Sequence, residues 1–296
     1  MHTILITGAN GQLGTELGNI LRSGQSELGP LPDFYKDCRI VGVDIDQLDL
    51  CDTERVLNYL EELSPDAVIN CAAMTNVDQC EEKRDLALRV NAIAPRTLAM
   101  GCERIGAKLV HVSTDYVFAG DGTTPYTEWD VCAPQSAYGA SKFLGERYVE
   151  SFSTRYFIVR TAWLYGYYGN NFVKTIARAG KRTGALQVVD DQRGNPTNAA
   201  DLAYMIAKLI PIEEYGIYHC TGKGECSWYD FACKIIEFLG IDATVSPCAT
   251  GQSERIAKRP AYSSLDNAMF RCTVGDDVRH WTEALRCFCE HVELED

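Results

Sequence analysis

A glycine-rich loop between a predicted strand and a predicted helix constrains this chain more than any other feature. The apolar run Thr3–Thr7 leads into Gly8, Gly11 and Gly14, and a helical pattern covers Gln12–Ser23. In a βαβ unit, the first glycine permits a tight turn, the second lets the backbone approach a pyrophosphate, and the third lets the helix pack on the sheet. The N–H groups of the helix N-terminus then face the phosphates. The pattern therefore predicts a dinucleotide-binding unit.

Short apolar runs alternate with helical patterns throughout residues 1–165. These runs are almost continuous Val, Ile and Leu, which is typical of a parallel sheet covered by helices on both faces. We therefore expect an α/β fold with a doubly wound, Rossmann-type parallel sheet, formed mainly by residues 1–165. Residues 166–296 are expected to form mainly a smaller, interleaved substrate-binding domain. Segments near 190–222 are expected to return to the first domain.

Capping residues and periodicity set several element boundaries. Thr53 is the candidate N-cap of a helix over Thr53–Leu63. A helical pattern runs without interruption over Arg84–Gly106. Residues 241–265 are expected to be irregular, and residues 276–290 are expected to form the closing helix.

Charge and cysteine usage exclude several classes of partner and location. The net charge of −13 over 296 residues argues against nucleic acid polymers and anionic membranes. The 13 cysteines are scattered without zinc-site spacing, which indicates a reducing compartment. No apolar run is long enough to span a membrane, and no signal peptide is recognised. The expected location is the cytoplasm.

An acidic residue at the end of the second predicted strand bears on the choice of dinucleotide. Asp44 can accept hydrogen bonds from the adenosine ribose hydroxyls, and its charge disfavours a 2′-phosphate. No Arg or Lys follows before Arg55. This pattern favours NADH and leaves NADPH open. Asp49 and Leu50 are weaker candidates for a place beside the adenine, and the alternative for Asp44 is an ordinary turn residue.

Three side chains suggest carbonyl chemistry. Thr114 follows the predicted strand around Val110–Val112, and Tyr138 and Lys142 share one face of a predicted helix. A tyrosine hydroxyl has a pKa near 10, which a neighbouring ammonium group lowers. Thr114 can then bind a substrate carbonyl oxygen, Tyr138 can protonate it as hydride reaches the carbon, and Lys142 can also bind the nicotinamide ribose. The alternative for Tyr138 and Lys142 is a solvated helix face.

Eight segments, in this order, carry a family resemblance: Cys71–Asp78, Asn91–Pro95, Ser113–Phe118, Tyr138–Lys142, Arg160–Trp163, Gly169–Phe172, Asp191–Thr197 and Arg259–Pro260. Together with the glycine loop they resemble the extended short-chain dehydrogenase/reductase family, and within it the dTDP-4-dehydrorhamnose reductase subgroup. The similarity covers essentially the whole chain. It implies NAD(P)H-dependent reduction of the 4-keto group of dTDP-4-dehydro-L-rhamnose to dTDP-L-rhamnose, a precursor of cell-surface polysaccharide.

The resemblance also implies residue roles. Tyr138 is the implied proton donor. Lys142 is implied to lower the pKa of Tyr138 and to bind the nicotinamide ribose, and Thr114 is implied to bind the carbonyl oxygen. Asn171 and Arg259 are expected near the nucleotide diphosphate, because an arginine fork binds two phosphate oxygens. The alternatives to ligand binding are that Trp163 is only a core aromatic residue and that Arg259 is only a surface cation. The expected cofactor-binding residues are Gly8, Asn10, Gly11, Gln12, Leu13, Gly14, Asp44, Asp49, Leu50, Cys71, Ala72, Ala73, Asn91, Tyr138 and Lys142. The expected substrate-binding residues are Thr75, Val77, Asp115, Tyr116, Val117, Trp163, Asn171 and Arg259.

The resemblance raises the question of a metal. Enteric members of the subgroup are thought to form dimers through a magnesium ion held by acidic residues. Glu16 falls on one matching position, but Ala200 stands where a second acid is expected, and Asp201 follows one residue later. We therefore expect no metal site, although Mg²⁺ is possible, and either a monomer or a homodimer.

Two other classes of function remain open, namely another nucleotide-sugar enzyme and a regulatory subunit. A nucleotide-sugar 4,6-dehydratase would have an Asp-Glu pair after the threonine, whereas Asp115 precedes Tyr116 here. A 4-epimerase or a reductase that forms the epimeric product would share the same three side chains. Some relatives are instead regulatory subunits of methionine adenosyltransferase, which bind the dinucleotide and modulate a partner enzyme.

Overall fold

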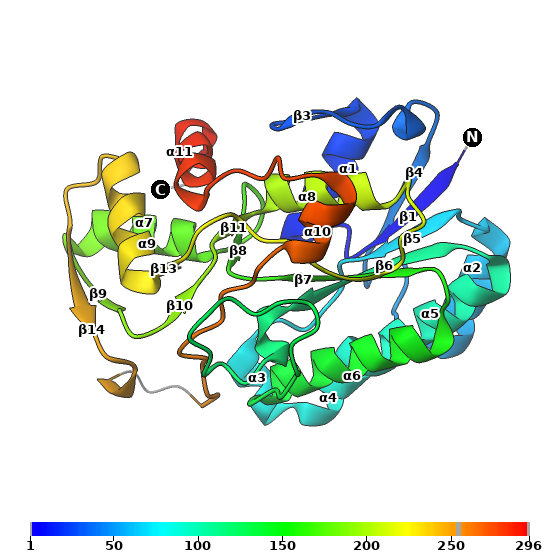
Figure 1. Cartoon of the computed structure of the whole chain (residues 1–296), viewed down its shortest axis with the longest axis horizontal. Coiled ribbons are helices and arrows are strands. Elements are labelled where there is room, and N and C mark those ends of the chain that lie inside the picture. Colours follow the sequence, from blue (N-terminus) through cyan, green and yellow to red (C-terminus); the bar gives the residue numbers. More distant parts are fainter. Residues whose placement is uncertain (1, 253–255, 295–296) are drawn as a thin grey trace.

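A parallel sheet of six strands forms the centre of the molecule (Figure 1). The computed structural model describes residues 2–252 and 256–294. The spatial order is β12 (Gly216–His219), β7 (Tyr156–Thr161), β6 (Lys108–Thr114), β5 (Ala67–Asn70), β1 (Thr3–Thr7) and β4 (Arg39–Val43). The chain passes from β1 to β4 and then crosses back to β5, so the strand order reverses between β1 and β5, where ligands bind in such sheets. The predicted α/β fold is confirmed.

Helices cover both faces of the sheet. One face carries α1 (Gln12–Ser23), α8 (Ala199–Leu209) and α10 (Ala268–Val274), and the other carries α2 (Thr53–Leu63), α5 (Ala94–Ile105) and α6 (Ala137–Phe152). Successive side chains of a strand point to opposite faces, so Ile4 and Ile6 enter the first core and Leu5 enters the second. Full burial of each such side chain contributes about 2 kcal/mol. Because helices cover both faces of the sheet, successive side chains of a strand are all buried, which explains the continuous apolar runs of the strands.

A smaller lobe lies beside the sheet, on the left of Figure 1. Its elements are α7 (Phe172–Thr183), α9 (Trp228–Phe238), α11 (Trp281–His291) and the parallel pair β9 (Ala185–Val189) and β14 (Thr244–Cys248). They share a third core that contains Phe231, Trp281 and Phe288. The α9 helix begins with a capping box between Ser227 and Asp230.

The two parts of the chain are interleaved. Within the predicted returning region, β12 joins the central sheet, whereas residues 193–198 pair outside it. The remaining strands form the pairs β2 (Gln25–Ser26) with β3 (Gly29–Pro30), β8 (Leu164–Tyr165) with β11 (Thr197–Asn198), and β10 (Arg193–Gly194) with β13 (Cys226–Ser227). The remaining helical segments are η1 (Asp33–Tyr35), α3 (Val77–Glu82), α4 (Arg84–Leu88), η2 (Arg89–Ile93), η3 (Asp115–Val117) and η4 (Thr250–Gln252).

Two predictions for the first half are wrong in detail. Asp52, not Thr53, caps α2, because the Asp52 side chain accepts a hydrogen bond from the Arg55 N–H. The pattern over Arg84–Gly106 is not one α-helix, since a π-helical turn over Arg89–Ile93 separates α4 from α5. Such turns are frequent at functional sites.

Two predictions for the second half also need correction. The segment 241–265 contains β14, whose side chains are mostly exposed or half-buried and therefore give no strong apolar signal. The closing helix α11 begins at Trp281 rather than at residue 276. The preceding residues instead place Asp277 and Arg279 in ion pairs with Lys208 and Asp201.

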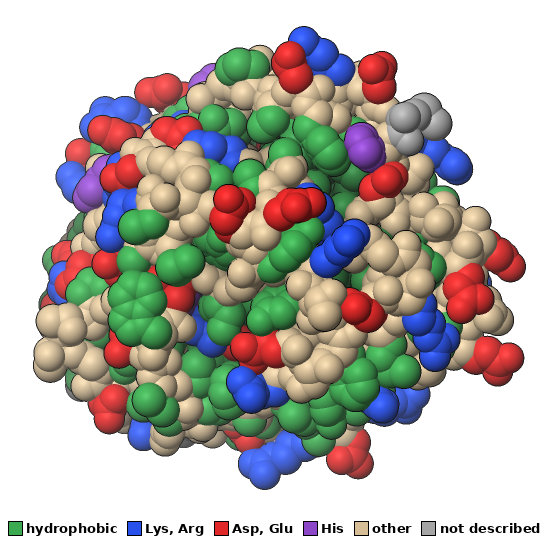
Figure 2. Space-filling view, turned by 45° about the vertical axis from the view of Figure 1, so that its right-hand side comes forward, with side chains coloured by type: hydrophobic (Ala, Val, Ile, Leu, Met, Phe, Trp, Pro, Cys, Tyr) green, Lys and Arg blue, Asp and Glu red, His purple; other side chains and the backbone are tan. Residues whose placement is uncertain are grey.

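The net negative charge is not gathered into one area on the face that Figure 2 displays, where acidic and basic side chains are interspersed. In the described residues, no helix combines the length and the apolar character needed to cross a bilayer.

Candidate active site

The glycine loop lies at the carboxyl end of β1, beside the residues that follow β5. Gly8 has a φ of +67°, and a Cβ atom there would lie 2.7 Å from the backbone nitrogen of Ala72. A Cβ atom on Gly14 would collide with the Gly8 carbonyl oxygen. Gly11 N–H donates to the same carbonyl at 3.1 Å. The glycines therefore let the loop pack tightly against itself and against the residues after β5, which is the turn that the dinucleotide fingerprint requires.

The acid predicted to face the ribose also supports this loop. Asp44 Oδ2 accepts a hydrogen bond from the Asn10 N–H at 3.0 Å, and Oδ1 accepts one from the Ile45 N–H at 2.8 Å. A carboxylate has about four lone-pair sites, so Asp44 retains capacity for a ribose hydroxyl. Asp49 is exposed and accepts from the Cys51 N–H at 2.9 Å. The structure gives Asp49 a turn-forming role and leaves adenine contact a prediction.

Three other predicted cofactor residues lie near the loop in different environments. Leu13 is buried in the core beneath α1, and Leu50 packs in the core on the opposite face of the sheet. The Gln12 side chain reaches the smaller lobe, where its Oε1 accepts from Asn171 Nδ2 at 2.9 Å. Only backbone groups of Leu13 are therefore available to a ligand. Cys71, Ala72 and Ala73 follow β5, and Ala72 lies beside Gly8.

Asn91 belongs to a hydrogen-bond network within the chain. It is 0% exposed in the π-helical turn, and its amide groups are used within the chain. Oδ1 accepts from Met74 N–H at 2.8 Å, and Nδ2 donates to Met74 O at 3.0 Å and to Ser141 Oγ at 3.1 Å. These bonds fix the loop after β5 against α6, and a direct contact between Asn91 and a cofactor stays a prediction.

The structure brings the three predicted catalytic side chains together at the carboxyl end of β6. Thr114 is the last residue of β6, and α6, capped by Ser136, carries Tyr138 and Lys142. A side-chain hydrogen bond joins Tyr138 and Thr114. The Tyr138 ring also lies edge-on to Tyr116, with centroids 5.4 Å apart.

The electrostatics of these groups differ from the simplest expectation. Burial raises the pKa of Tyr138, and its side-chain hydrogen bond with Thr114 opposes that rise. Lys142 Nζ donates to the Val112 carbonyl at 2.6 Å. Burial lowers the pKa of Lys142 to about 8. Burial therefore dominates the pKa of Tyr138 in the protein alone, in the direction opposite to the lowering expected from Lys142.

Asp115 is a buried acid immediately beside Thr114. It is 3% exposed, and its Oδ1 accepts a hydrogen bond from Thr114 Oγ1 at 2.9 Å. Burial raises its pKa to about 6, and a side-chain hydrogen bond with Ser263 opposes that rise. Its second oxygen is buried. Val117 is buried in the core.

Two predicted substrate residues have structural partners. Asn171 caps α7 through the Lys174 N–H at 3.1 Å and links to Gln12, so its side chain is engaged within the chain. Trp163 has a φ of +48° and stacks on Trp228 with centroids 3.5 Å apart. Such a φ is unfavourable for a bulky residue and often marks a functional position. Trp163 thus remains a candidate for a planar ligand group.

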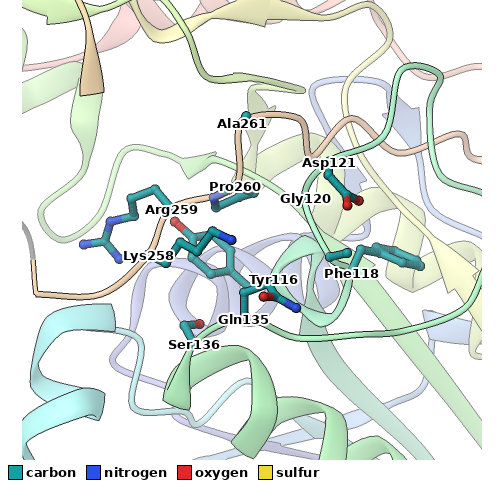
Figure 3. Close-up of a pocket in the computed structure, with 11 residues that line it drawn as sticks. Tyr116, Phe118, Gly120, Asp121, Gln135, Ser136, Lys258, Arg259, Pro260 and Ala261 are labelled. Carbon is teal, nitrogen blue, oxygen red and sulfur yellow. The ribbon is translucent and has the colours of Figure 1, made fainter. Parts of the chain in front are cut away.

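A pocket of about 260 Å³ opens beside Tyr116 (Figure 3). Arg259 also lines it, where its side chain hydrogen-bonds Tyr116, and it pairs with Asp78 on α3, with Nη2 and Oδ2 2.9 Å apart. Lys258 is exposed and extends toward Tyr116. The predicted role of Arg259 at a diphosphate stays a prediction, and Lys258 is a second cation at the same pocket. Sequence analysis missed Lys258 because only the tertiary structure shows that both adjacent cations lie at the pocket.

The remaining predicted substrate residues lie at the start of α3. Thr75 is exposed, and Val77 is the first residue of the helix and half-buried. Gln135 and Ser136 line the pocket, and no sequence motif marks them as ligand-facing.

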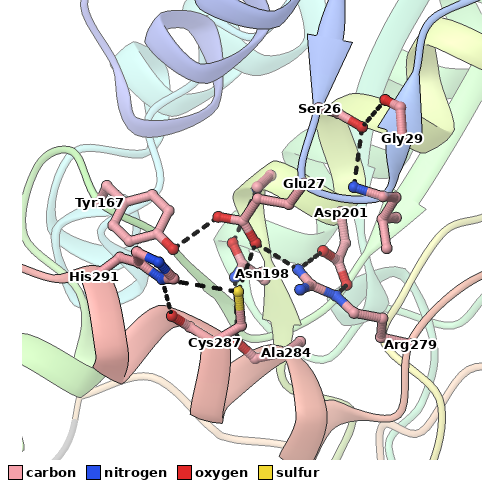
Figure 4. Close-up of polar contacts among 12 residues, drawn as sticks. Ser26, Glu27, Gly29, Tyr167, Asn198, Asp201, Arg279, Ala284, Cys287 and His291 are labelled. Atoms are coloured by element: carbon pink, nitrogen blue, oxygen red, sulfur yellow. Dashed lines mark hydrogen bonds and ion pairs between the residues drawn. The ribbon is translucent and has the colours of Figure 1, made fainter.

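One of the acidic residues that raised the magnesium question, Asp201, meets a cation of the chain itself (Figure 4). Arg279 forms an ion pair with buried Asp201, and its Nη2 also donates to Glu27 Oε2 at 2.8 Å. Glu27 accepts from the Tyr167 hydroxyl at 2.7 Å. Glu16 lies near Glu27 with a pKa that burial raises to about 7. No group of three or more His, Cys, Asp or Glu suited to a metal is found among the described residues, and these acids do not fit a magnesium ion.

Comparisons with known proteins agree with the geometry. The family model "RmlD substrate binding domain" matches residues 1–294. The chain is 47% identical to the crystal structure of a dTDP-4-dehydrorhamnose reductase from Clostridium acetobutylicum, with a TM-score of 0.92 and coverage of 97% of this chain and 98% of that one. A dTDP-4-dehydrorhamnose reductase from Bacillus anthracis, in complex with NADP, is 43% identical, with a TM-score of 0.91 and coverage of 99% and 100%.

A further relative extends the comparison to named polysaccharide synthesis. The spore coat polysaccharide biosynthesis protein SpsK of Bacillus subtilis is 39% identical over 286 residues, which cover 97% of this chain and 96% of SpsK. The matches span almost the full length of each protein, so both the sheet and the smaller lobe are shared. The chain belongs to the RmlD substrate binding domain family, together with these dTDP-4-dehydrorhamnose reductases.

Proposed function

We propose that this protein reduces the 4-keto group of dTDP-4-dehydro-L-rhamnose to give dTDP-L-rhamnose, with NAD(P)H as the reductant. The observation that carries the proposal is the meeting of Thr114, Tyr138 and Lys142 at the carboxyl end of β6, beside the glycine loop. A binding subunit would not need a tyrosine, a lysine and a hydroxyl in this arrangement.

The side chains divide the reaction among them. Bound in the glycine loop, NAD(P)H supplies the hydride that C4 of the sugar receives. Thr114 and Tyr138 donate hydrogen bonds to the ketone oxygen and so polarise the carbonyl. Tyr138 then transfers its hydroxyl proton to that oxygen, and the ketone becomes an alcohol. Lys142, as a cation on the same helix face, favours the phenolate that remains.

The pocket beside Tyr116 supports recognition of a sugar nucleotide. The exposed ammonium of Lys258 and the guanidinium of Arg259 both lie at this pocket and are available to the diphosphate. The stacked Trp163 and Trp228 offer an aromatic surface to the base. These contacts explain how an acidic protein can hold an anionic ligand through local cations.

Two further parts of the proposal concern context. Each of the 13 cysteines lies in the described part of the chain, and all are free. Free thiols fit a reducing cytoplasm, where we place the enzyme. The product would enter cell-surface polysaccharide, and the similarity to SpsK supports that destination.

The test is to mix the protein with dTDP-4-dehydro-L-rhamnose and either NADH or NADPH, to follow nicotinamide absorbance, and to identify the sugar product. Cofactor oxidation with formation of dTDP-L-rhamnose is the expected result, and the two rates rank the cofactors. Formation of the 4-epimer would reassign the stereochemistry. Cofactor binding without oxidation would favour a regulatory subunit, which should instead co-purify with a partner enzyme.

A further inference from the structure

A completely buried ion pair lies on the side of α6 that carries the catalytic residues. Arg160 on β7 is 2% exposed, and Glu146 on α6 is 0% exposed. Arg160 Nε donates to Glu146 Oε1 at 3.0 Å, and Nη2 donates to Oε2 at 2.8 Å, so both carboxylate oxygens are engaged. The cost of desolvating such a pair often exceeds the gain from its attraction. Stability alone is therefore a weak explanation for its presence.

Glu146 continues the spacing of the two catalytic residues on the helix. Tyr138, Lys142 and Glu146 are four residues apart in turn and so share one face. Lys142 is 2% exposed, and within the described chain its only hydrogen bond goes to the Val112 carbonyl. Burial lowers the pKa of Lys142, and the negative charge of Glu146 is the first of two influences that oppose this change. The other is the thiol of Cys71.

The histidine and cysteine side chains around the pair are uncharged near neutral pH, and the neighbouring charges on α6 form an ion pair at the surface. Burial and the charge of Lys142 lower the pKa of His111 on β6, which keeps its ring neutral. Burial raises the pKa of Cys71 to about 12 and that of Cys132 to about 11, so both remain thiols. Glu150 lies one turn further along α6 and pairs with Arg147 at 2.8 Å at the surface. Glu146 is thus the buried anion that faces Lys142.

Arg160 also fixes the chain that leads into α6. Its Nη1 donates to the Glu128 carbonyl at 3.4 Å, and Nη2 donates to Cys132 Sγ at 3.2 Å. The guanidinium group lies over the Phe118 ring, 5.1 Å from its centroid. One cation therefore binds the Glu146 carboxylate and anchors the loop that leads into α6.

We propose that Glu146 is a positioning residue for the reduction, whose carboxylate, clamped by Arg160, keeps Lys142 protonated beside Tyr138. The proposal rests on the proposed reductase function. Tyr138 becomes an anion when it transfers its proton, and a neutral Lys142 could not stabilise that charge. In the absence of Glu146, burial would drive Lys142 toward its neutral form within the working pH range.

The test is the Glu146→Gln variant, which keeps the side-chain shape and removes the charge. Two quantities are measured: the pKa of Lys142, by NMR of protein labelled at the lysine ε-carbons, and the pH profile of kcat/KM with NAD(P)H and the ketosugar. We expect the Lys142 pKa and the alkaline limb of the profile to fall together by about one pH unit. The NMR titration needs no turnover. A wild-type protein that reduces no ketosugar would refute the proposed function, whereas an unshifted Lys142 pKa would refute this inference.

Two further variants separate charge from packing. Glu150→Gln makes the same change one turn along α6, in a surface pair, and should leave both quantities unchanged. Glu146→Gln leaves Arg160 buried without its partner, so the double variant Glu146→Gln/Arg160→Gln keeps the test available if the single variant does not fold. It should show the same downward shift. A folded variant with reduced kcat but an unshifted profile would overturn the proposal and assign the pair to packing alone.

Discussion

Two regions place charged side chains near the candidate active site, one in the core and one at the surface. On α6 and β7, Lys142, Glu146 and Arg160 are at most 2% exposed, and Glu146 and Arg160 pair with each other. In residues 256–261, Lys258 is exposed beside the pocket, and Arg259 reaches across to Asp78. The first region is part of the core, and the second lines the opening through which a ligand would enter.

The difference follows from solvation. A buried charge needs a partner within the chain because its desolvation cost is never recovered from water. An exposed cation is screened and can exchange water for a ligand phosphate at little cost. Changes on α6 should therefore act on kcat, and changes in residues 256–261 should act on KM.

The largest expected effect is on kcat and comes from the buried region, at Tyr138, the proposed proton donor. Tyr138→Phe removes the hydroxyl and should lower kcat about 10²- to 10⁴-fold, the usual contribution of general acid catalysis. Cofactor affinity, measured by fluorescence titration, should stay within about twofold because the glycine loop is untouched. Tyr148→Phe, on the same helix and stacked under Arg96, is the matched control. Full activity of the Tyr138 variant would exclude it as the acid.

Glu16 extends the comparison of buried and exposed charges, because it is a buried acid with no cation beside it among the described residues. Glu16 is 8% exposed, and among the described residues none forms an ion pair with it. Its pKa is raised from 4.5 to about 7, so the folded state holds the proton more tightly than the unfolded chain does. This stabilisation is complete below the unfolded pKa and is lost as the pH rises through about 7. The loss amounts to at most about 3 kcal/mol.

The Glu16→Gln variant should therefore be more stable than the wild type at pH 8, and this advantage should shrink at pH 5. Urea unfolding of both proteins at the two pH values gives the free energies of unfolding. Glu62→Gln, at an exposed position of α2, is the control and should show no such dependence. An advantage of Glu16→Gln that is equal at both pH values would contradict the raised pKa.

The exposed region should give a smaller effect, of a different kind. Lys258→Met should raise KM for the nucleotide sugar about tenfold, and kcat should stay within about twofold, because one phosphate contact is lost. Affinity for dTDP should fall while affinity for thymidine changes little. Lys181→Met, an exposed lysine near the end of α7, is the control. A loss in kcat with unchanged KM would break the proposed division between the two regions.

The smallest expected effect concerns cofactor choice. Asp44→Ala should weaken NADH binding about three- to tenfold and change NADPH binding less, since only the 2′-hydroxyl of NADH can donate to the carboxylate. The Asn10 N–H also loses its acceptor, and this loss is common to both cofactors. Binding constants for the two cofactors in the variant and in the wild type provide the comparison. Equal losses would leave Asp44 as a loop support only.

Local chemistry explains why much of the first half could be predicted. The strand Thr3–Thr7 and the helix Gln12–Ser23 match the structure to the residue, because the glycines and the apolar runs leave little freedom. The α6 helix begins directly after Ser136, whose side chain caps it through the Gly139 N–H. The π-helical turn at Arg89–Ile93 was missed because its cause, the hydrogen bonds of Asn91 to Met74, lies outside the helix.

The smaller lobe was harder to predict because its elements depend on distant partners. Strand β14 is mostly exposed and exists through its pairing with β9, more than 50 residues earlier. Helix α11 begins late because Arg279, just before it, is drawn to Asp201 and Glu27. Neither partner is near in sequence, so no window of residues contains the signal.

The sequence by itself determined the doubly wound sheet, the glycine loop, the family and the three candidates for the catalytic side chains. Those depend on glycine sterics, strand periodicity and the four-residue spacing of Tyr138 and Lys142 on a helix. Only the tertiary structure decided which charges meet. It pairs Arg259 with Asp78, places Lys258 beside Arg259 at the pocket, and gives Asp201 to Arg279. Pairing depends on distance and burial in three dimensions, and residue order carries neither quantity.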